Sequence, residues 1–334
     1  MKAFIRGSGQ SLPEQVVTNE EIAGRLGLEP EQIFKSSGIR RRRWAAPGTT
    51  TSSLASAALK LALEDARLEA SDVDYLLFGT MTPDRFIPGS APSVQKSLGL
   101  RESPCLDIRA TCCNALYGLQ LARALVTSGA ARNVAICLAE VQSAWLDLAP
   151  ASGTTSMLFG DGASALLVSA EETEGSLEIL DILLATDGRF VDDLGIRCPG
   201  TEYGTAHSHD AGEHGADYKA RMVGQSVIVQ ASRKMAAACQ ALLERNGHTI
   251  SDVRWIVPHQ ANVNLLAQVA RSLRFPTQGG GVITVLEDFG NTSSASMGIA
   301  LDTLRRQGRI ERGDHLLLPA FGAGFTWGAG LCRA

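Results

Sequence analysis

The chain has 334 residues, of which 45% are hydrophobic and 20% charged, and its formal net charge is −4. These proportions are typical of an ordinary folded protein, and the length suggests two domains or one large α/β unit. The mildly acidic balance argues against nucleic acid as a general partner, because phosphate binding needs clustered cationic surface.

The cysteine spacing and the apolar runs bear on the cellular compartment in which the protein is expected. The seven cysteines show no CxxC spacing, so they indicate neither a disulfide framework nor a zinc site. The segment 1–7 lacks the apolar core of a signal peptide, and no run approaches 18 apolar residues. We therefore expect a cytoplasmic protein that does not bind membranes and holds no metal or cofactor.

The first unusual segment is a run of four arginines at 40–43. Such a run is typical either of a solvated loop or of a surface that contacts phosphate or an acidic protein. The sequence leaves both interpretations open.

Short apolar runs then alternate with helical patterns. The expected strands lie at 75–78, 134–138, 165–168, 255–257 and 316–318. Glycine, proline or charged residues bound each run, and the alternation predicts an α/β layered fold.

Two adjacent cysteines, Cys112 and Cys113, stand where an apolar strand runs into a helix that should end at Gly129. A thiol in the first turn of a helix faces unpaired N–H groups and the positive end of the helix dipole, which favour the nucleophilic thiolate. The alternative is that each cysteine is simply a small buried hydrophobe.

The sequence also contains an internal repeat. Residues 57–73 and 237–253 share a pattern that ends in Ser-Asp-Val, and a strand follows each copy. A second helix, starting near Asn291 and ending at Gly308, matches the helix after Cys112. This predicts two similar halves, 1–172 and 173–334, with Asn291 in the position of Cys112, although chance similarity is the alternative.

At these residues the chain resembles the thiolase superfamily, and most closely its β-ketoacyl-acyl-carrier-protein synthase III group. The motifs that carry the resemblance, in order along the chain, are 7–19, 37–40, the Cys112 junction, 158–163, 257–262, 290–296 and 321–328. The resemblance implies a five-layered αβαβα fold of two pseudo-equivalent halves, forming a homodimer.

The resemblance further implies a Cys-His-Asn triad of Cys112, His259 and Asn291. Cys112 would accept an acyl group, with the backbone N–H groups of Cys112 and Ala323 as the oxyanion hole. Alanine at 323, where the family commonly has glycine, excludes torsions that only glycine adopts. His259 and Asn291 would stabilise the enolate formed when a malonyl thioester loses CO2.

Other residues gain roles from the same resemblance. It implies substrate-binding roles for Asn262 and Phe321, and it places Phe86 and Ile87 in a stretch that reaches across the dimer into the partner's acyl pocket. His207, His209 and His214 allow a metal site, but their polar, glycine-rich surroundings favour a solvated loop.

The chain departs from the family where coenzyme A would bind. Gln32, Ser36 and Ser152 occupy the positions of a tryptophan and two arginines that contact the adenine region. The missing stacking face and guanidinium groups favour a donor on a carrier protein, or an unusual coenzyme A ester held by its pantetheine arm. Lys35 and the arginine run 40–43 could compensate in part, and the run could face an acidic carrier.

The leading interpretation is a condensing enzyme that transfers an acyl group from coenzyme A or acyl carrier protein to Cys112 and then condenses it with malonyl-acyl carrier protein. We expect the enzyme to take part in fatty-acid or polyketide biosynthesis. The alternative is an acyltransferase on the same scaffold that moves an acyl group to another acceptor without decarboxylation.

Overall fold

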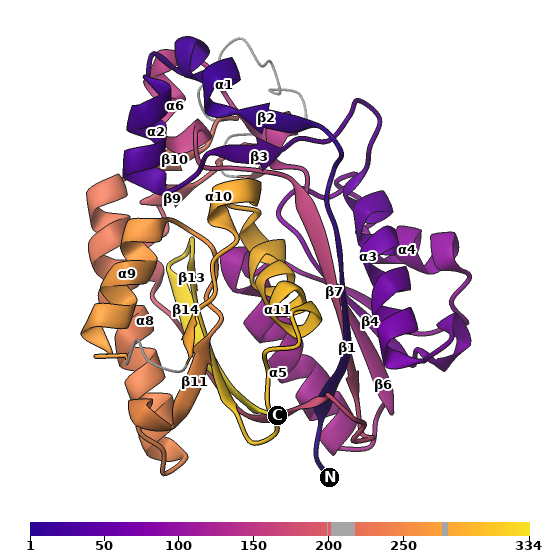
Figure 1. Cartoon of the computed structure of the whole chain (residues 1–334). Helices are drawn as coiled ribbons and strands as arrows, with labels where there is room; N and C mark the ends of the chain where they lie inside the picture. Colours follow the sequence, from indigo (N-terminus) through magenta and orange to yellow (C-terminus); the bar gives the residue numbers. More distant parts are fainter. Residues whose placement is uncertain (199, 202–217, 276–279) are drawn as a thin grey trace.

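The computed structural model describes residues 1–198, 200–201, 218–275 and 280–334. Ten of the described strands form one continuous sheet whose two ends fold over a central pair of helices (Figure 1), and four others form two separate two-stranded sheets. The strands of the first half are β1 (Phe4–Ser11), β4 (Tyr75–Gly79), β5 (Cys105–Ile108), β6 (Asn133–Glu140) and β7 (Gly162–Ser169). Those of the second half are β8 (Leu177–Thr186), β11 (Val253–Ile256), β12 (Gly281–Val282), β13 (His315–Gly322) and β14 (Thr326–Arg333).

The same strand arrangement occurs twice. In the first half the order is β1-β7-β6-β4-β5, and in the second it is β8-β14-β13-β11-β12. In both, the first three strands pair antiparallel and the last two add in parallel. The two sets join through a short pairing of β1 with β8 at Phe4 and Ile5. The sheet therefore has two pseudo-equivalent halves.

Helices make the remaining layers (Figure 1). The central pair is α5 (Asn114–Thr127) and α11 (Ser296–Arg306). Outside the first half lie α3 (Thr51–Ala66) and α4 (Ala91–Leu98), and outside the second lie α8 (Gly224–Arg245) and α9 (Val263–Ser272). The order helix, sheet, helix, sheet, helix is the five-layered fold that the sequence predicted.

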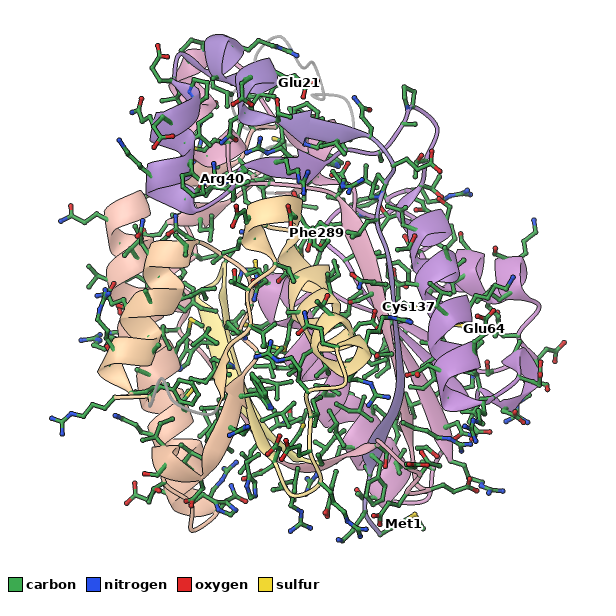
Figure 2. All side chains as sticks on the ribbon, viewed as in Figure 1. Met1, Glu21, Arg40, Glu64, Cys137 and Phe289 are labelled. Carbon is green, nitrogen blue, oxygen red and sulfur yellow. The ribbon has the colours of Figure 1, made fainter. Side chains whose placement is uncertain are left out.

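Side chains fill the spaces between these layers (Figure 2), and many of the buried ones are apolar. A central cluster joins α5 and α11 to strands of both halves, and two further clusters lie beneath α3 and beneath α8 and α9. A buried hydrogen bond of 2.8 Å from the Ser8 hydroxyl to Asp302 also links the halves. Because the largest cluster takes residues from both halves, neither half has a complete core of its own.

A smaller cap of short helices and strands sits at one end of the layers (Figure 1). It has its own apolar cluster around Ile22, Leu26 and Ile33. Its elements are β2 (Val16–Thr18), α1 (Asn19–Leu26), α2 (Pro30–Ser37), β3 (Arg41–Arg43), α6 (Gly153–Ser156), β9 (Leu194–Gly195), β10 (Arg221–Met222) and α10 (Leu286–Phe289).

All five expected strands are present, with ends that differ by a few residues. The helix after Cys112 ends at Thr127, and Gly129 follows with a φ of 78°. The helix expected from near Asn291 begins later, at Ser296, because Ser293 has a φ of 48°, which does not fit a regular α-helix. The predicted division after residue 172 falls between β7 and β8, and as a domain boundary it stays a prediction.

Candidate active site

Cys112 lies in a single 3-10 turn, η2 (Thr111–Cys113), that connects β5 to α5. Thr111 has a φ of 52°, so the chain turns sharply before the helix starts. This turn leaves the Cys112 side chain partly exposed and sends Cys113 into the core, where it is fully buried. Of the two cysteines, only Cys112 is accessible to a substrate.

The turn after β13 closes over Cys112. A Cβ on Gly322 would lie 2.2 Å from Thr111 Oγ1 and 2.9 Å from the Cys112 nitrogen, so only glycine allows this approach. Thr111 Oγ1 also donates to the Ala323 carbonyl at 3.3 Å. Ala323 has no positive φ, and Gly324 takes the unusual torsion at 132° instead. Alanine at 323 is therefore compatible with the turn.

His259 follows β11 and is anchored on both sides. Its backbone N–H donates to the Pro319 carbonyl at 2.9 Å, which ties it to β13. Its ring nitrogen Nδ1 lies 2.7 Å from the Ser296 hydroxyl at the start of α11. No side-chain partner of the other ring nitrogen, Nε2, is found among the described residues, and a hydrogen bond between His259 and the Ser293 backbone opposes the effect of burial on the His259 pKa.

Asn291 is oriented by its own backbone turn. Its Oδ1 accepts the Ser293 N–H at 2.9 Å, which fixes Nδ2 as the opposite end of the amide. Nδ2 donates no hydrogen bond among the described residues. The backbone of Asn291 bonds to Leu158 and Gly160, which holds the turn in place.

Burial sets the protonation of this site. It raises the pKa of the Cys112 thiol to about 11; the Ser293 hydroxyl opposes this shift, and the nearby Glu140 carboxylate adds to it. Burial also lowers the pKa of His259 to about 4. Desolvation of the charge thus opposes the helix N-terminus, and the expectation that the helix end favours a thiolate stays a prediction. Near neutral pH the site holds a thiol and an uncharged imidazole.

The structure adds residues to which the sequence analysis assigned no individual role. Ser293 Oγ lies 3.5 Å from Cys112 Sγ, so one hydroxyl connects the Cys112 thiol to the Asn291 turn. Ser294 donates at 2.6 Å to Glu140, a fully buried carboxylate that also accepts from Thr82. These serines lie in the motif 290–296, but their roles depend on where each hydroxyl points, which sequence patterns do not give.

The internal repeat needs one correction. The turn before α11, η8 (Ser293–Ala295), repeats the turn η2, and each starts with a residue of positive φ, Thr111 or Ser293. Ser294 is therefore the counterpart of Cys112. The predicted equivalence of Asn291 with Cys112 was wrong by three residues.

The expected substrate-binding residues are found in different surroundings. Phe86 and Ile87 are 75% and 77% exposed on the loop between β4 and α4. Phe321 is buried, with its ring centroid 4.8 Å from that of Phe325. Asn262 caps α9, since its Oδ1 accepts the Asn264 N–H and its Nδ2 donates to the Ser36 carbonyl. A contact of any of these four with substrate stays a prediction.

The three positions of the missing adenine contacts carry only short polar groups. Gln32 is exposed. Ser36 Oγ donates to the Gln32 carbonyl at 2.8 Å, and Ser152 Oγ donates to Asp147 at 2.7 Å. The two hydroxyls are thus already bonded within the protein. Lys35, suggested as compensation, lies 3.8 Å from Glu31 on an exposed helix face.

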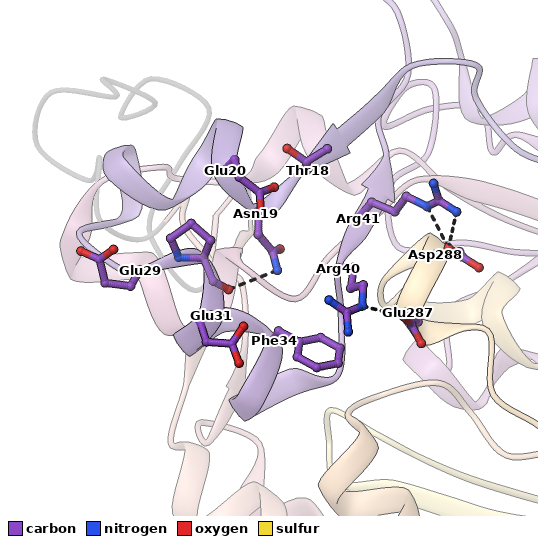
Figure 3. Close-up of a pocket in the computed structure, with 11 residues that line it drawn as sticks. Thr18, Asn19, Glu20, Glu29, Glu31, Phe34, Arg40, Arg41, Glu287 and Asp288 are labelled. Carbon is purple, nitrogen blue, oxygen red and sulfur yellow. Dashed lines mark hydrogen bonds and ion pairs between the residues drawn. The ribbon is translucent and has the colours of Figure 1, made fainter.

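The arginine run is neither a free basic surface nor a solvated loop. Arg40 pairs with Glu287 and Arg41 with Asp288, both at 2.7 Å, across a pocket of about 660 Å³ (Figure 3). Arg42 is fully buried and donates to Asn19, while Arg43 is partly buried and donates to backbone carbonyls. The suggestion that this run serves an acidic carrier stays a prediction, and it is weakened because Arg40 and Arg41 are paired with carboxylates and Arg42 is buried.

Two further expectations concern metal and membrane binding. His207, His209 and His214 lie outside the described residues. Among the residues that are described, no group of three or more metal-ligating side chains comes together. No helix within the described ranges is long and apolar enough to cross a bilayer.

Family comparisons agree with this geometry. Residues 106–188 match the model for 3-oxoacyl-[acyl-carrier-protein] synthase III, and residues 243–334 match the model for its C-terminal part. A β-ketoacyl-[acyl-carrier-protein] synthase III from Nitratidesulfovibrio vulgaris is 40% identical over 99% of this chain and 98% of its own length. One from Methylococcus capsulatus is 37% identical over 98% of each chain.

Solved structures give the same result. The 3-oxoacyl-[acyl-carrier-protein] synthase III from Aquifex aeolicus VF5 superimposes with a TM-score of 0.88 at 32% identity, covering 100% of both chains. The priming β-ketosynthase of the R1128 polyketide pathway superimposes with a TM-score of 0.89 at 30% identity, covering 99% of this chain and 96% of its own.

Proposed function

The chain belongs to the 3-oxoacyl-[acyl-carrier-protein] synthase III family of condensing enzymes, and from that premise we propose that Cys112, His259 and Asn291 divide a two-step condensation between them. The observation that carries this proposal is the pair of nitrogens without a side-chain partner among the described residues, His259 Nε2 and Asn291 Nδ2, on residues linked by hydrogen bonds to the turn beside the Cys112 thiol.

In the first step the Cys112 sulfur attacks the carbonyl carbon of an acyl thioester. The thiol proton ends on the departing thiol of the donor, so the enzyme carries a neutral acyl thioester and no net proton is gained or lost. The backbone N–H groups of Cys112 and Ala323, which donate no hydrogen bond among the described residues, would stabilise the oxyanion.

In the second step malonyl-acyl carrier protein loses CO2, and the electron pair of the broken bond forms an enolate. Two neutral N–H donors, on His259 and Asn291, stabilise the enolate oxygen, each worth about 3 kcal/mol of barrier. The enolate carbon attacks the acyl group on Cys112, and the released thiolate takes a proton from solvent because its pKa of about 11 favours the thiol.

The acyl donor is an acyl thioester of coenzyme A or of acyl carrier protein. The engaged hydroxyls of Ser36 and Ser152 support a donor that is recognised without its adenine. The exposure of Phe86 and Ile87 supports a homodimer in which this loop is covered by a second copy. Simple acyl transfer would not need the two donors, so condensation is the better supported activity.

Intact-mass analysis tests the proposal directly. The protein is incubated with a panel of acyl-coenzyme A and acyl-carrier-protein thioesters and then with malonyl-acyl carrier protein. We expect a mass increase of one acyl group, which disappears only after the malonyl thioester is added, with release of CO2 and a β-ketoacyl product. An acyl group that leaves to other acceptors without CO2 release would overturn condensation in favour of transfer.

A further inference from the structure

The Ser296 hydroxyl lies beside His259 and is within hydrogen-bond distance of three groups. Its oxygen lies 2.7 Å from His259 Nδ1 and 2.9 Å from the Ser293 carbonyl, and it accepts the backbone N–H of Gln260 at 3.1 Å. Ser296 is fully buried at the first position of α11, so no solvent competes for these bonds.

A serine hydroxyl has one proton to donate, and here two acceptors lie within reach. The Ser293 carbonyl already accepts the backbone N–H of Ser296, so it stays paired without the hydroxyl proton. The His259 nitrogen has no such substitute, and it is also the nearer of the two acceptors. A hydroxyl proton directed at the Ser293 carbonyl and one directed at His259 Nδ1 both fit these distances, and only the second requires His259 Nδ1 to be an acceptor.

The direction of the Ser296 hydroxyl proton decides which nitrogen of the His259 ring carries the ring proton. Burial lowers the pKa of His259 to about 4, so near neutral pH the ring carries a single proton. If Nδ1 accepts from Ser296, that proton must sit on Nε2. Nε2 is the nitrogen without a side-chain partner among the described residues, and an N–H there would join the Asn291 Nδ2 donor.

We propose that Ser296 is a positioning residue that holds His259 in the tautomer with its proton on Nε2, so that His259 donates to the enolate oxygen. The proposal rests on the proposed condensation for its purpose but not for its geometry. Without the Ser296 hydroxyl, Nδ1 loses its donor, and the ring is free to place its proton on Nδ1 and turn a lone pair toward the enolate.

Nitrogen NMR of the full-length protein labelled with 15N-histidine reads the tautomer without any turnover. The His259 signals are assigned by their loss in His259→Gln. We expect a protonated Nε2 and an unprotonated Nδ1 in the unsubstituted protein at pH 7, and a shift toward protonated Nδ1 in Ser296→Ala. Decarboxylation should fall about tenfold to a hundredfold in Ser296→Ala, while the rate of Cys112 acylation changes less than about threefold.

Ser164→Ala is the matched control. Ser164 is also a buried serine whose hydroxyl donates into the same turn, to the Ala295 carbonyl at 3.0 Å, but it does not touch His259. We expect it to change neither the tautomer nor the decarboxylation rate.

Protonated Nδ1 in the unsubstituted protein would overturn the proposal, and this holds even if Ser296→Ala does not fold. An unchanged tautomer in a folded Ser296→Ala would overturn it as well. Failure of condensation with the expected tautomer intact would instead count against the proposed function alone.

Discussion

The Cys113 thiol donates to the Thr326 carbonyl, with 3.4 Å between sulfur and oxygen, and this bond holds Cys113 inside the core. Its neighbour Cys112 faces the turn that contains Gly322 and is partly exposed. Two residues with the same chemistry thus have opposite environments, which favours Cys112 over Cys113 as the proposed nucleophile.

We expect an acyl thioester to label Cys112 and not Cys113. The reason is accessibility, since Cys113 is fully buried and its pKa is raised even further by burial and by Cys112. Peptide mapping after acylation gives the position. Labelling should disappear in Cys112→Ala and persist in Cys113→Ala, and a label on Cys113 would contradict the assignment.

Alkylation of Cys112 by iodoacetamide should accelerate about tenfold per pH unit from pH 7 to 9 without a plateau. Thiolate is the reactive form, and a pKa of about 11 keeps its fraction small and proportional to hydroxide across this range. A free cysteine peptide, with an ordinary pKa near 8.5, serves as control and should level off. A plateau for Cys112 below pH 8 would show that the resting site holds a thiolate.

Asn291→Asp should reduce malonyl decarboxylation about a hundredfold while Cys112 acylation falls far less. The substitution keeps an oxygen to accept the Ser293 N–H but replaces the Nδ2 donor with a negative charge beside the enolate. His259→Ala should show the same division. Single-turnover acylation and CO2 release are measured separately, and a variant that loses acylation but still decarboxylates would reverse the assigned roles.

His259 should make the protein less stable in mild acid. The unfolded chain binds a proton at the ordinary pKa of 6.5 and the folded chain only near 4, so between these values the unfolded state binds more protons and stability falls as pH falls. Between pH 7 and 5 this amounts to about 2 kcal/mol of unfolding free energy. The free energy of unfolding of His259→Gln, measured with urea, should not show this part of the decrease between pH 7 and 5. An equal decrease in both proteins would contradict the lowered pKa of His259.

The acyl donor should be recognised without its adenine. For one acyl group, kcat/KM on coenzyme A should exceed that on pantetheine by less than about tenfold, because Ser36 and Ser152 offer neither a stacking face nor a phosphate clamp. Gln32→Trp combined with Ser36→Arg should raise the preference for coenzyme A. An advantage above about a hundredfold, or 2.7 kcal/mol, in the unsubstituted protein would contradict this prediction.

Ordered motifs around Cys112, His259 and Asn291 were enough to predict the family and the layered fold, while the roles of these three residues stay a prediction. The helix start at Ser296 was missed because the positive φ of Ser293 arises from the turn and leaves no periodic signal. The ion pairs of the arginine run were also missed, since the acidic partners of Arg40 and Arg41 lie 247 residues further along the chain. Contacts of that kind depend on tertiary structure, and local sequence patterns do not contain them.

Cys112 of the first half is bounded by Gly322 and Ser293 from the second half. During synthesis, therefore, Cys112 leaves the ribosome long before the residues that surround it. Until the last strands β13 and β14 pair, the thiol lacks these neighbours. On the proposed mechanism, acyl loading of Cys112 therefore requires the complete fold.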